Sequence, residues 1–227
     1  MLKALCRNAI KSFSIGMTLI LASGCTLVKP DPLPTIPPLG SSSAPIEIPV
    51  PSWTPSGRWR GLSSTCPTIS HELPGLSGLA GEGKPADGYQ KLSTGLAASC
   101  GWQRKGEEYP NIHVLIRMYW RDYDQTVVQQ AIEYLKEARN DAEEKALKDP
   151  LVKPPQDVPG VGDEAFLTLY PGDMRISLRA RSENAVIFAN IWLKDDWDYD
   201  DRRRIELVSA QRSNIIALMV DVLDDLR

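Results

Sequence analysis

The stretch MRISLRARSENAVIFANIWL, residues 174–193, contains two apolar patterns separated by one short turn. In its first half, apolar side chains occupy every second position, which is the period of a strand with one buried face. Residues 185–193 are apolar on both faces, as in the central strand of a sheet. Ser182, Glu183 and Asn184 are polar and separate the two halves. The stretch therefore predicts an antiparallel hairpin whose second strand lies inside a larger sheet.

Three segments outside this hairpin also have regular apolar spacing. Residues 112–120 alternate with period two and predict another strand. Asp124 is a candidate cap for a long helix that ends at Asp149-Pro150, because the residue before a proline disfavours the helical conformation. The last 25 residues place apolar side chains on one stripe and predict a final helix. Hairpins and two long helices predict, for residues 61–227, one α+β domain with a mainly antiparallel sheet.

The first 25 residues have the three parts of an export signal. Lys3, Arg7 and Lys11 form a positive region, and the apolar stretch that follows is shorter than the roughly 20 residues that span a bilayer. It ends in LASGC, residues 21–25, which resembles the lipobox of bacterial lipoproteins. We therefore expect a lipoprotein signal peptide over residues 1–24 and a lipidated Cys25. The alternatives are a plain secretory signal with a chance cysteine and an uncleaved anchor.

Residues 25–60 have the composition of a linker rather than of a folded domain. Half of the 18 prolines lie between Pro30 and Pro55, and no helix or strand period runs through the segment. Proline-rich chains favour an extended conformation of about 3.1 Å per residue, so the segment could reach on the order of 100 Å. We expect a tether between lipid and domain, with Trp59 a candidate to dock on the domain. A ligand for a proline-recognising module is the alternative.

The four cysteines divide between the signal and the domain. Cys6 would leave with the signal peptide and Cys25 would carry the lipid, so Cys66 and Cys100 remain in the exported chain. An even pair in an exported protein favours a disulfide. Two buried free thiols are the alternative.

Several short motifs, taken together with the lipobox and the tether, resemble a family of actinobacterial lipoproteins that carry a domain of unknown function. The motifs are Cys66-Pro67, Cys100-Gly101-Trp102 and the segment VPGVGDEA, residues 158–165. The resemblance covers most of residues 62–227 and implies an α/β sandwich-like envelope domain, similar to PsbP/Mog1-type folds. It supplies no catalytic residues.

Charge and composition narrow the classes of partner. The chain has a net charge of −3 and only two histidines. This balance argues against a nucleic-acid binder, which would be basic, and two histidines leave little scope for a multi-histidine metal site. Removal of residues 1–24 takes away three positive charges and leaves 23 Lys and Arg against 29 Asp and Glu, a net charge of −6. Attachment of this acidic domain to an anionic membrane would therefore depend on acyl chains. Separately, we expect no cofactor.

Two groups of residues are candidates for a binding surface. Arg175, Arg179 and Arg181 form a basic stripe on one strand face, which suits an anionic polymer or headgroup or, alternatively, a solvated face paired with acids. Trp192, Trp197 and Tyr199 follow or end the predicted central strand and are suited to stack on sugar or to contact a partner, or to pack in the core.

The acidic run at residues 195–201 is the third candidate, and it has two interpretations. Asp196, Asp198 and Asp200 imitate the start of a calcium loop, but Asp201 and Leu207 stand where the loop needs glycine and glutamate. The other interpretation is a run of acids that offsets the dipole at a helix N-terminus.

These observations predict a lipid-anchored domain at the extracytoplasmic face of the cell membrane. We expect a non-enzymatic binding or accessory role toward a membrane or envelope protein complex or a wall ligand, with Trp197 and Tyr199 on the working surface. An envelope hydrolase with an unrecognised active site is the alternative.

Overall fold

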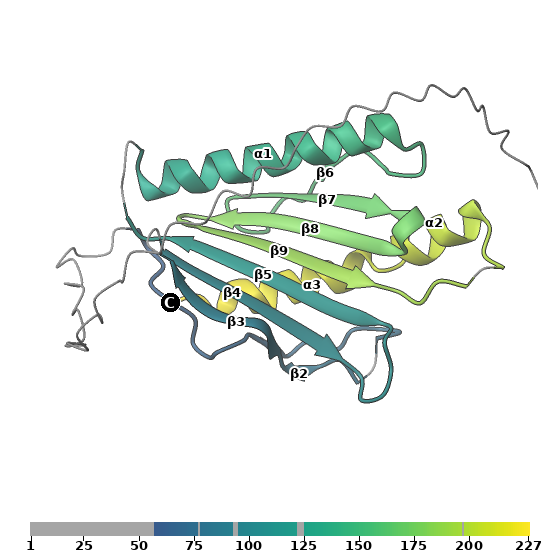
Figure 1. Ribbon diagram of the computed structural model, residues 1–227, viewed down its shortest axis with the longest axis horizontal. Coiled ribbons are helices and arrows are strands. Elements are labelled where there is room, and N and C mark those ends of the chain that lie inside the picture. Colours follow the sequence, from purple (N-terminus) through teal and green to yellow (C-terminus); the bar gives the residue numbers. More distant parts are fainter. Residues whose placement is uncertain (1–56, 77, 93–94, 122–124, 197) are drawn as a thin grey trace, which may run out of the picture. The chain divides into compact units, whose positions relative to one another are not determined.

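The computed structural model describes residues 57–76, 78–92, 95–121, 125–196 and 198–227, and for 87–92 the backbone only. The signal peptide, Cys25, most of the tether, Asp124 and Trp197 lie outside the described residues. A seven-stranded sheet with the order β3-β4-β5-β9-β8-β7-β6 dominates the domain, and every neighbouring pair is antiparallel (Figure 1). Its strands are β3 (Lys84–Leu92), β4 (Gly95–Gln103), β5 (Asn111–Tyr119), β6 (Gln156–Asp157), β7 (Glu164–Tyr170), β8 (Arg175–Ser182) and β9 (Ala185–Trp192).

The hairpin predicted from residues 174–193 is present as β8 and β9, and its register pairs Ser182 with Ala185. Glu183 adopts a positive φ of 50° in the turn. β9 lies between β5 and β8, which accounts for its apolar residues on both faces. The α+β class and the mainly antiparallel sheet are therefore confirmed.

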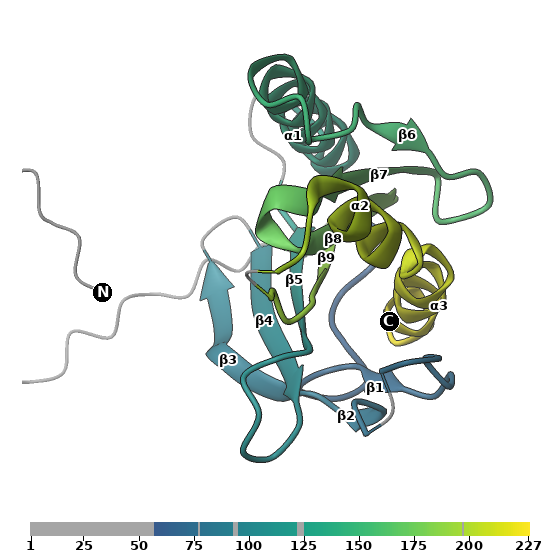
Figure 2. The same ribbon diagram turned by 90° about the vertical axis from the view of Figure 1, so that its right-hand side faces the viewer.

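Helices pack on both faces of this sheet. Figure 2 shows α1 (Val127–Lys148) on one side and α3 (Arg212–Asp224) on the other, and α2 (Asp201–Ser209) precedes α3. A 3-10 turn, η1 (Pro171–Asp173), joins β7 to β8, and β1 (Thr68–Ile69) pairs with β2 (Gly81–Glu82) as a separate small sheet. None of the helices in the described ranges is long and apolar enough to cross a membrane.

Two details of the predicted helices were wrong. The hydroxyl of Thr126, not Asp124, caps α1, since it accepts a hydrogen bond from the backbone N–H of Gln129 at 3.2 Å. The predicted final helix is interrupted at Ala210–Gln211, where the chain turns so that α2 lies against β7 and η1 while α3 lies against β8 and β9. No proline or glycine marks this break, so the apolar spacing alone could not locate it.

The sheet separates two cores. The α3 side holds the larger one, which includes Trp102, Ile116, Ile176 and Met219. The α1 side holds a smaller core in which the alanines of α1, with Leu135, pack against Tyr119, Phe166 and Val186. Because alanine is short, this helix can lie close to the strands.

The predicted disulfide between Cys66 and Cys100 is present, with the two Cα atoms 5.8 Å apart. Both cysteines are buried in the larger core. The bond ties the segment before β1 to the second strand from one edge of the sheet, because Cys100 lies in β4. Beside it, the indole of Trp102 donates a hydrogen bond to the carbonyl of Gly81 at 2.9 Å, which holds β2 against the same strand.

The polypeptide enters the domain at the β8–β9 turn. The buried side chain of Asn184 accepts from the backbone N–H of Trp59 at 2.9 Å and donates to the carbonyls of Trp59 and Tyr119. The indole of Trp59 also donates to the hydroxyl of Ser182. Trp59 therefore docks on the domain, as its place beside the tether predicts, at the end of the sheet where β5 and β8 finish.

Candidate functional site

The sheet face toward α1 can be followed row by row, because cross-strand partners in an antiparallel sheet point to the same side. Across β4, β5, β9 and β8, the four rows are Gln103, Asn111, Trp192 and Arg175; Gly101, His113, Asn190 and Ser177; Ser99, Leu115, Phe188 and Arg179; and Ala97, Arg117, Val186 and Arg181. α1 contacts the last two rows, where the ring centroids of Tyr134 and Phe188 lie 5.5 Å apart. The first two rows lie at the end of the sheet opposite Asn184.

These first two rows carry a group of polar and aromatic side chains that we call the sheet-end surface. Its residues are Gln103, Asn111, His113, Arg175, Asn190 and Trp192. All are at least partly exposed to solvent. They come from four strands, so the sheet itself holds them in place.

Arg175 is the best-positioned cation of this surface. Its guanidinium lies 4.0 Å from the ring centroid of Tyr170 and 5.8 Å from that of Trp192. It also donates to the amide oxygen of Asn190 at 3.4 Å and pairs with the exposed Asp173 at 3.4 Å. The charge is thus fixed beside an indole, which is an arrangement suited to bind a ligand with both an anionic group and an apolar face.

The neighbouring polar groups are also oriented by contacts within the domain. His113 lies edge-on to Trp192, with centroids 6.2 Å apart, and its Nε2 is 2.7 Å from the hydroxyl of Ser99. The side-chain amides of Gln103 and Asn111 both donate to the carbonyl of Glu108, in the loop that joins β4 to β5. Their positions therefore depend little on a ligand, which lowers the entropic cost of binding one.

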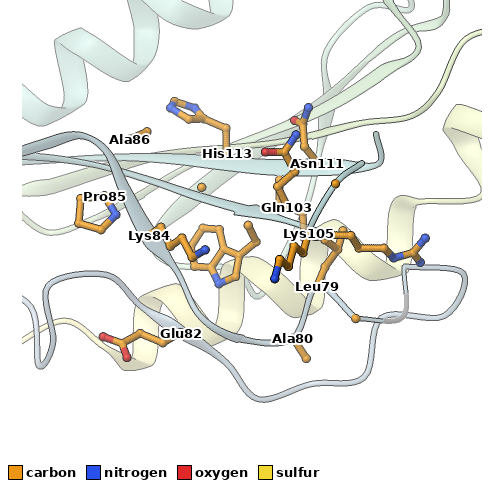
Figure 3. A pocket seen from close by; sticks show the side chains of 16 residues that line it. Leu79, Ala80, Glu82, Lys84, Pro85, Ala86, Gln103, Lys105, Asn111 and His113 are labelled. Carbon is orange, nitrogen blue, oxygen red and sulfur yellow. The ribbon is translucent and has the colours of Figure 1, made fainter. Parts of the chain in front are cut away.

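A pocket of about 770 Å³ adjoins this surface at the edge of the sheet. Figure 3 shows Gln103, Asn111 and His113 on one side of the strands, while Glu82 points away from His113. The charged side chains that line it are Glu82, Lys84, Arg104 and Lys105. Arg104 pairs with Glu107 at 3.3 Å, whereas neither Lys84 nor Lys105 forms an ion pair with another residue that the structure describes. The volume is in the range of small-ligand sites.

The basic stripe predicted on β8 is present on one face, but two of its members have structural partners. Arg181 pairs with Asp163 at 2.9 Å. Arg179 lies against Phe166 and Phe188 and donates to the carbonyl of Ala138 in α1. Burial lowers the pKa of this guanidinium from its ordinary value. Only Arg175 joins the sheet-end surface, and the alternative of pairing with acids holds for Arg175 and Arg181, which pair with Asp173 and Asp163.

The aromatic residues predicted as one binding group also lie in different places in the structure. Trp192 joins the sheet-end surface, whereas Tyr199 is half-buried and packs against the larger core. The prediction for Trp197 lies outside the described residues. Periodicity could not distinguish these positions, because burial of Tyr199 depends on how the loop after β9 folds back.

The acidic run before α2 caps a helix. Asp200 accepts a hydrogen bond from the backbone N–H of Arg203 at 2.7 Å, and Asp195 pairs with Arg204 at 3.2 Å. Within the described part of the chain, no group of three or more His, Cys, Asp or Glu residues could hold a metal ion. The acids thus act as the dipole interpretation predicts.

One cluster contains the residue types of a hydrolytic triad but not their arrangement. The hydroxyl of Ser70 donates to Oδ1 of Asp221 at 2.5 Å, and Nδ1 of His71 lies 2.7 Å from the same oxygen. In a triad the serine would contact the histidine instead. Asp221, on α3, also accepts the backbone N–H groups of Ser70 and His71. The cluster therefore ties the loop after β1 to α3.

No family model, no curated protein and no solved structure matches the chain. The resemblance to actinobacterial lipoproteins and to PsbP/Mog1-type folds stays a prediction from the motifs. The motif residues have structural roles: a Cβ on Gly162 would lie 2.4 Å from the carbonyl oxygen of Arg181, and Gly160 and Gly162 both have positive φ.

Proposed function

We propose that the protein is a lipid-anchored, extracytoplasmic binding domain, without enzymatic activity, that engages a component of the cell envelope. The observation that carries the proposal is the separation between the point of chain entry and the sheet-end surface. Trp59 docks beside Asn184, at one end of β5 and β9, and the surface lies at the other end. A nine-residue strand such as β5 spans roughly 26 Å.

This arrangement suits a domain that is held at a membrane by its N-terminal segment. With a tether and anchor before residue 57, the sheet-end surface and its pocket would be free to face the envelope. Loops and strand ends on a rigid scaffold are where binding residues are usually found. The proposal includes membership of the actinobacterial lipoprotein family, on the motifs around Cys66, Cys100 and Gly160.

A binding role is favoured over the alternative of an envelope hydrolase by the two polar clusters. In the Ser70 cluster the serine hydroxyl donates to Asp221 and not to His71, so the imidazole is not placed as its base, and the lowered pKa of the Asp221 carboxyl makes that group a weak base. At the sheet-end surface, Ser99 and His113 are in contact, but Ser99 is only 6% exposed.

The anchor is tested by Cys25→Ala. We expect this variant to remain an uncleaved precursor without lipid, because the thiol is the atom that would be alkylated. Metabolic labelling with palmitate, followed by mass determination of the purified chain, measures both outcomes. Labelling of Cys25→Ala at the wild-type level would contradict the anchor, and Cys6→Ala, which should label normally, is the matched control.

The binding role is tested by affinity purification from solubilised envelopes. We expect a component, protein or glycan, that co-purifies with the wild type and is reduced about tenfold by Lys84→Glu/Lys105→Glu, because charge reversal changes attraction to repulsion at two exposed positions. Lys136→Glu/Lys145→Glu, on exposed positions of α1, makes the same change in charge elsewhere and should have no effect. Equal recovery from both variants and the wild type would show that the pocket is not the binding surface.

A further inference from the structure

We propose that the pocket and the sheet-end surface together bind an anionic glycan, a sugar chain that carries carboxylate groups. This inference rests on the proposed binding function and names the ligand class. The first argument is charge. The eight positions in the two rows of the sheet-end surface include Arg175 and no carboxylate. The adjoining pocket is lined by Lys84, Arg104 and Lys105 against one carboxylate, that of Glu82. The chain as a whole is acidic, so this excess of cations is local to the sheet-end surface and its pocket.

The second argument is the distribution of cations that remain available. Lys84 and Lys105 line the pocket without an ion-pair partner among the described residues. Arg175 lies at the other side of the sheet-end surface, and its only carboxylate partner in the described part of the chain is the exposed Asp173. Cations at both ends of one surface suit an extended ligand with repeated negative charges better than a single small anion.

The third argument is the chemistry between the cations. Trp192 offers a flat apolar ring to the C–H face of a sugar, and its neighbours are amides and an imidazole. The amide oxygens of Gln103 and Asn111 accept no hydrogen bond from another described residue, while their nitrogens donate to Glu108. Oxygens held in this way can accept from sugar hydroxyls, which need acceptors as well as donors. A polyanion without hydroxyl groups would leave these oxygens unused.

The experiment measures binding of the full-length chain, purified from membranes in detergent, by isothermal titration calorimetry. The probe is hexagalacturonate. The controls are its methyl ester, which has the same sugars without charge, and hexaglutamate, which has the charges without sugars. We expect hexagalacturonate to bind and each control to bind about tenfold more weakly, and we expect affinity to fall as NaCl rises, because salt screens exposed charges.

The variants locate the binding. Lys84→Gln/Lys105→Gln should weaken binding of hexagalacturonate by about tenfold, since two exposed cations are lost from the surface. Lys136→Gln/Lys145→Gln should bind as the wild type does. All four positions are exposed, so equal melting temperatures are expected and serve as the folding check.

Each other outcome overturns the inference. Equal binding of the ester would show that charge is not recognised, and equal binding of hexaglutamate would show that sugar is not. Unchanged affinity in Lys84→Gln/Lys105→Gln, or no binding of hexagalacturonate, would also refute it. None of these results depends on lipid attachment. A failure here would therefore refute the glycan ligand but not the proposed function, which the Cys25→Ala and envelope co-purification experiments test.

Discussion

The double substitution Cys66→Ala/Cys100→Ala is expected to lower the free energy of unfolding by about 3–4 kcal/mol. The two cysteines are 34 residues apart in the sequence, and a cross-link over that distance removes much of the conformational freedom of the unfolded chain. For a domain of this size the loss corresponds to a decrease of about 10 °C in melting temperature, measured by circular dichroism or calorimetry.

The single variants and thiol titration are the controls. Cys66→Ala and Cys100→Ala should each cost as much as the double variant or slightly more, because each leaves one buried thiol without its partner. In the wild type, no thiol of the domain should react with iodoacetamide after denaturation until a reductant is added, and then two should react. Alkylation of both before reduction would show that the disulfide does not form.

The Cys66–Cys100 disulfide also holds residues that line the pocket. Cys100 is followed by Gly101 and Trp102, which line the pocket, and Trp102 holds Gly81 by a hydrogen bond. Loss of the bond frees the segment before β1, and the chain after β1 supplies the pocket-lining residues Gly78, Leu79, Ala80 and Glu82. We therefore expect ligand affinity to decrease along with stability.

Apolar periodicity predicted those elements of the fold whose apolar spacing fits either a strand or a helix but not both. The hairpin of β8 and β9, strand β5 and helix α1 follow directly from it. β3 and β4 were harder to recognise, because they contain Gly95, Gly101 and small residues that lack a strand pattern. β4 is held in the sheet by pairing with β5 and by the disulfide, which are contacts between separate parts of the chain, and β3 pairs with β4.

The candidate site was predicted in part, for the same physical reason. Arg175 and Trp192 stood out by residue type, but the pairing that brings them beside Asn111 and His113 depends on strand order, which no local pattern contains. Lys84 and Lys105 have no distinguishing sequence signal; they matter only because the sheet edge and the β4–β5 loop lie side by side at the pocket. Arg179 belongs to the same predicted stripe as Arg175, yet its guanidinium donates to the carbonyl of Ala138 in α1.

Asp221 carries the second large effect. Burial alone raises the pKa of its carboxyl, but the hydrogen bonds from Ser70 and His71 favour the ionised form more strongly, and the net result is a pKa below the ordinary value. Its side chain is only 4% exposed. Asp221→Ala removes the acceptor of these bonds, and we expect it to lower the free energy of unfolding by about 2–3 kcal/mol at neutral pH.

The pH dependence distinguishes this role from simple packing. Because the pKa of Asp221 is lower in the folded than in the unfolded chain, its contribution to stability is complete above the unfolded value of about 3.9 and is lost as the pH falls through the folded value. Asp221→Asn should therefore lose stability at neutral pH and flatten the decrease of melting temperature below about pH 4. Asp225 is the matched control, since burial raises its pKa. Its folded form binds the proton more readily than the unfolded form, so Asp225→Asn should steepen the decrease of melting temperature on acidification, at pH values just above the unfolded value of about 3.9. If both variants changed the decrease of melting temperature at low pH in the same direction, the hydrogen bonds from Ser70 and His71 would not be what stabilises the Asp221 carboxylate.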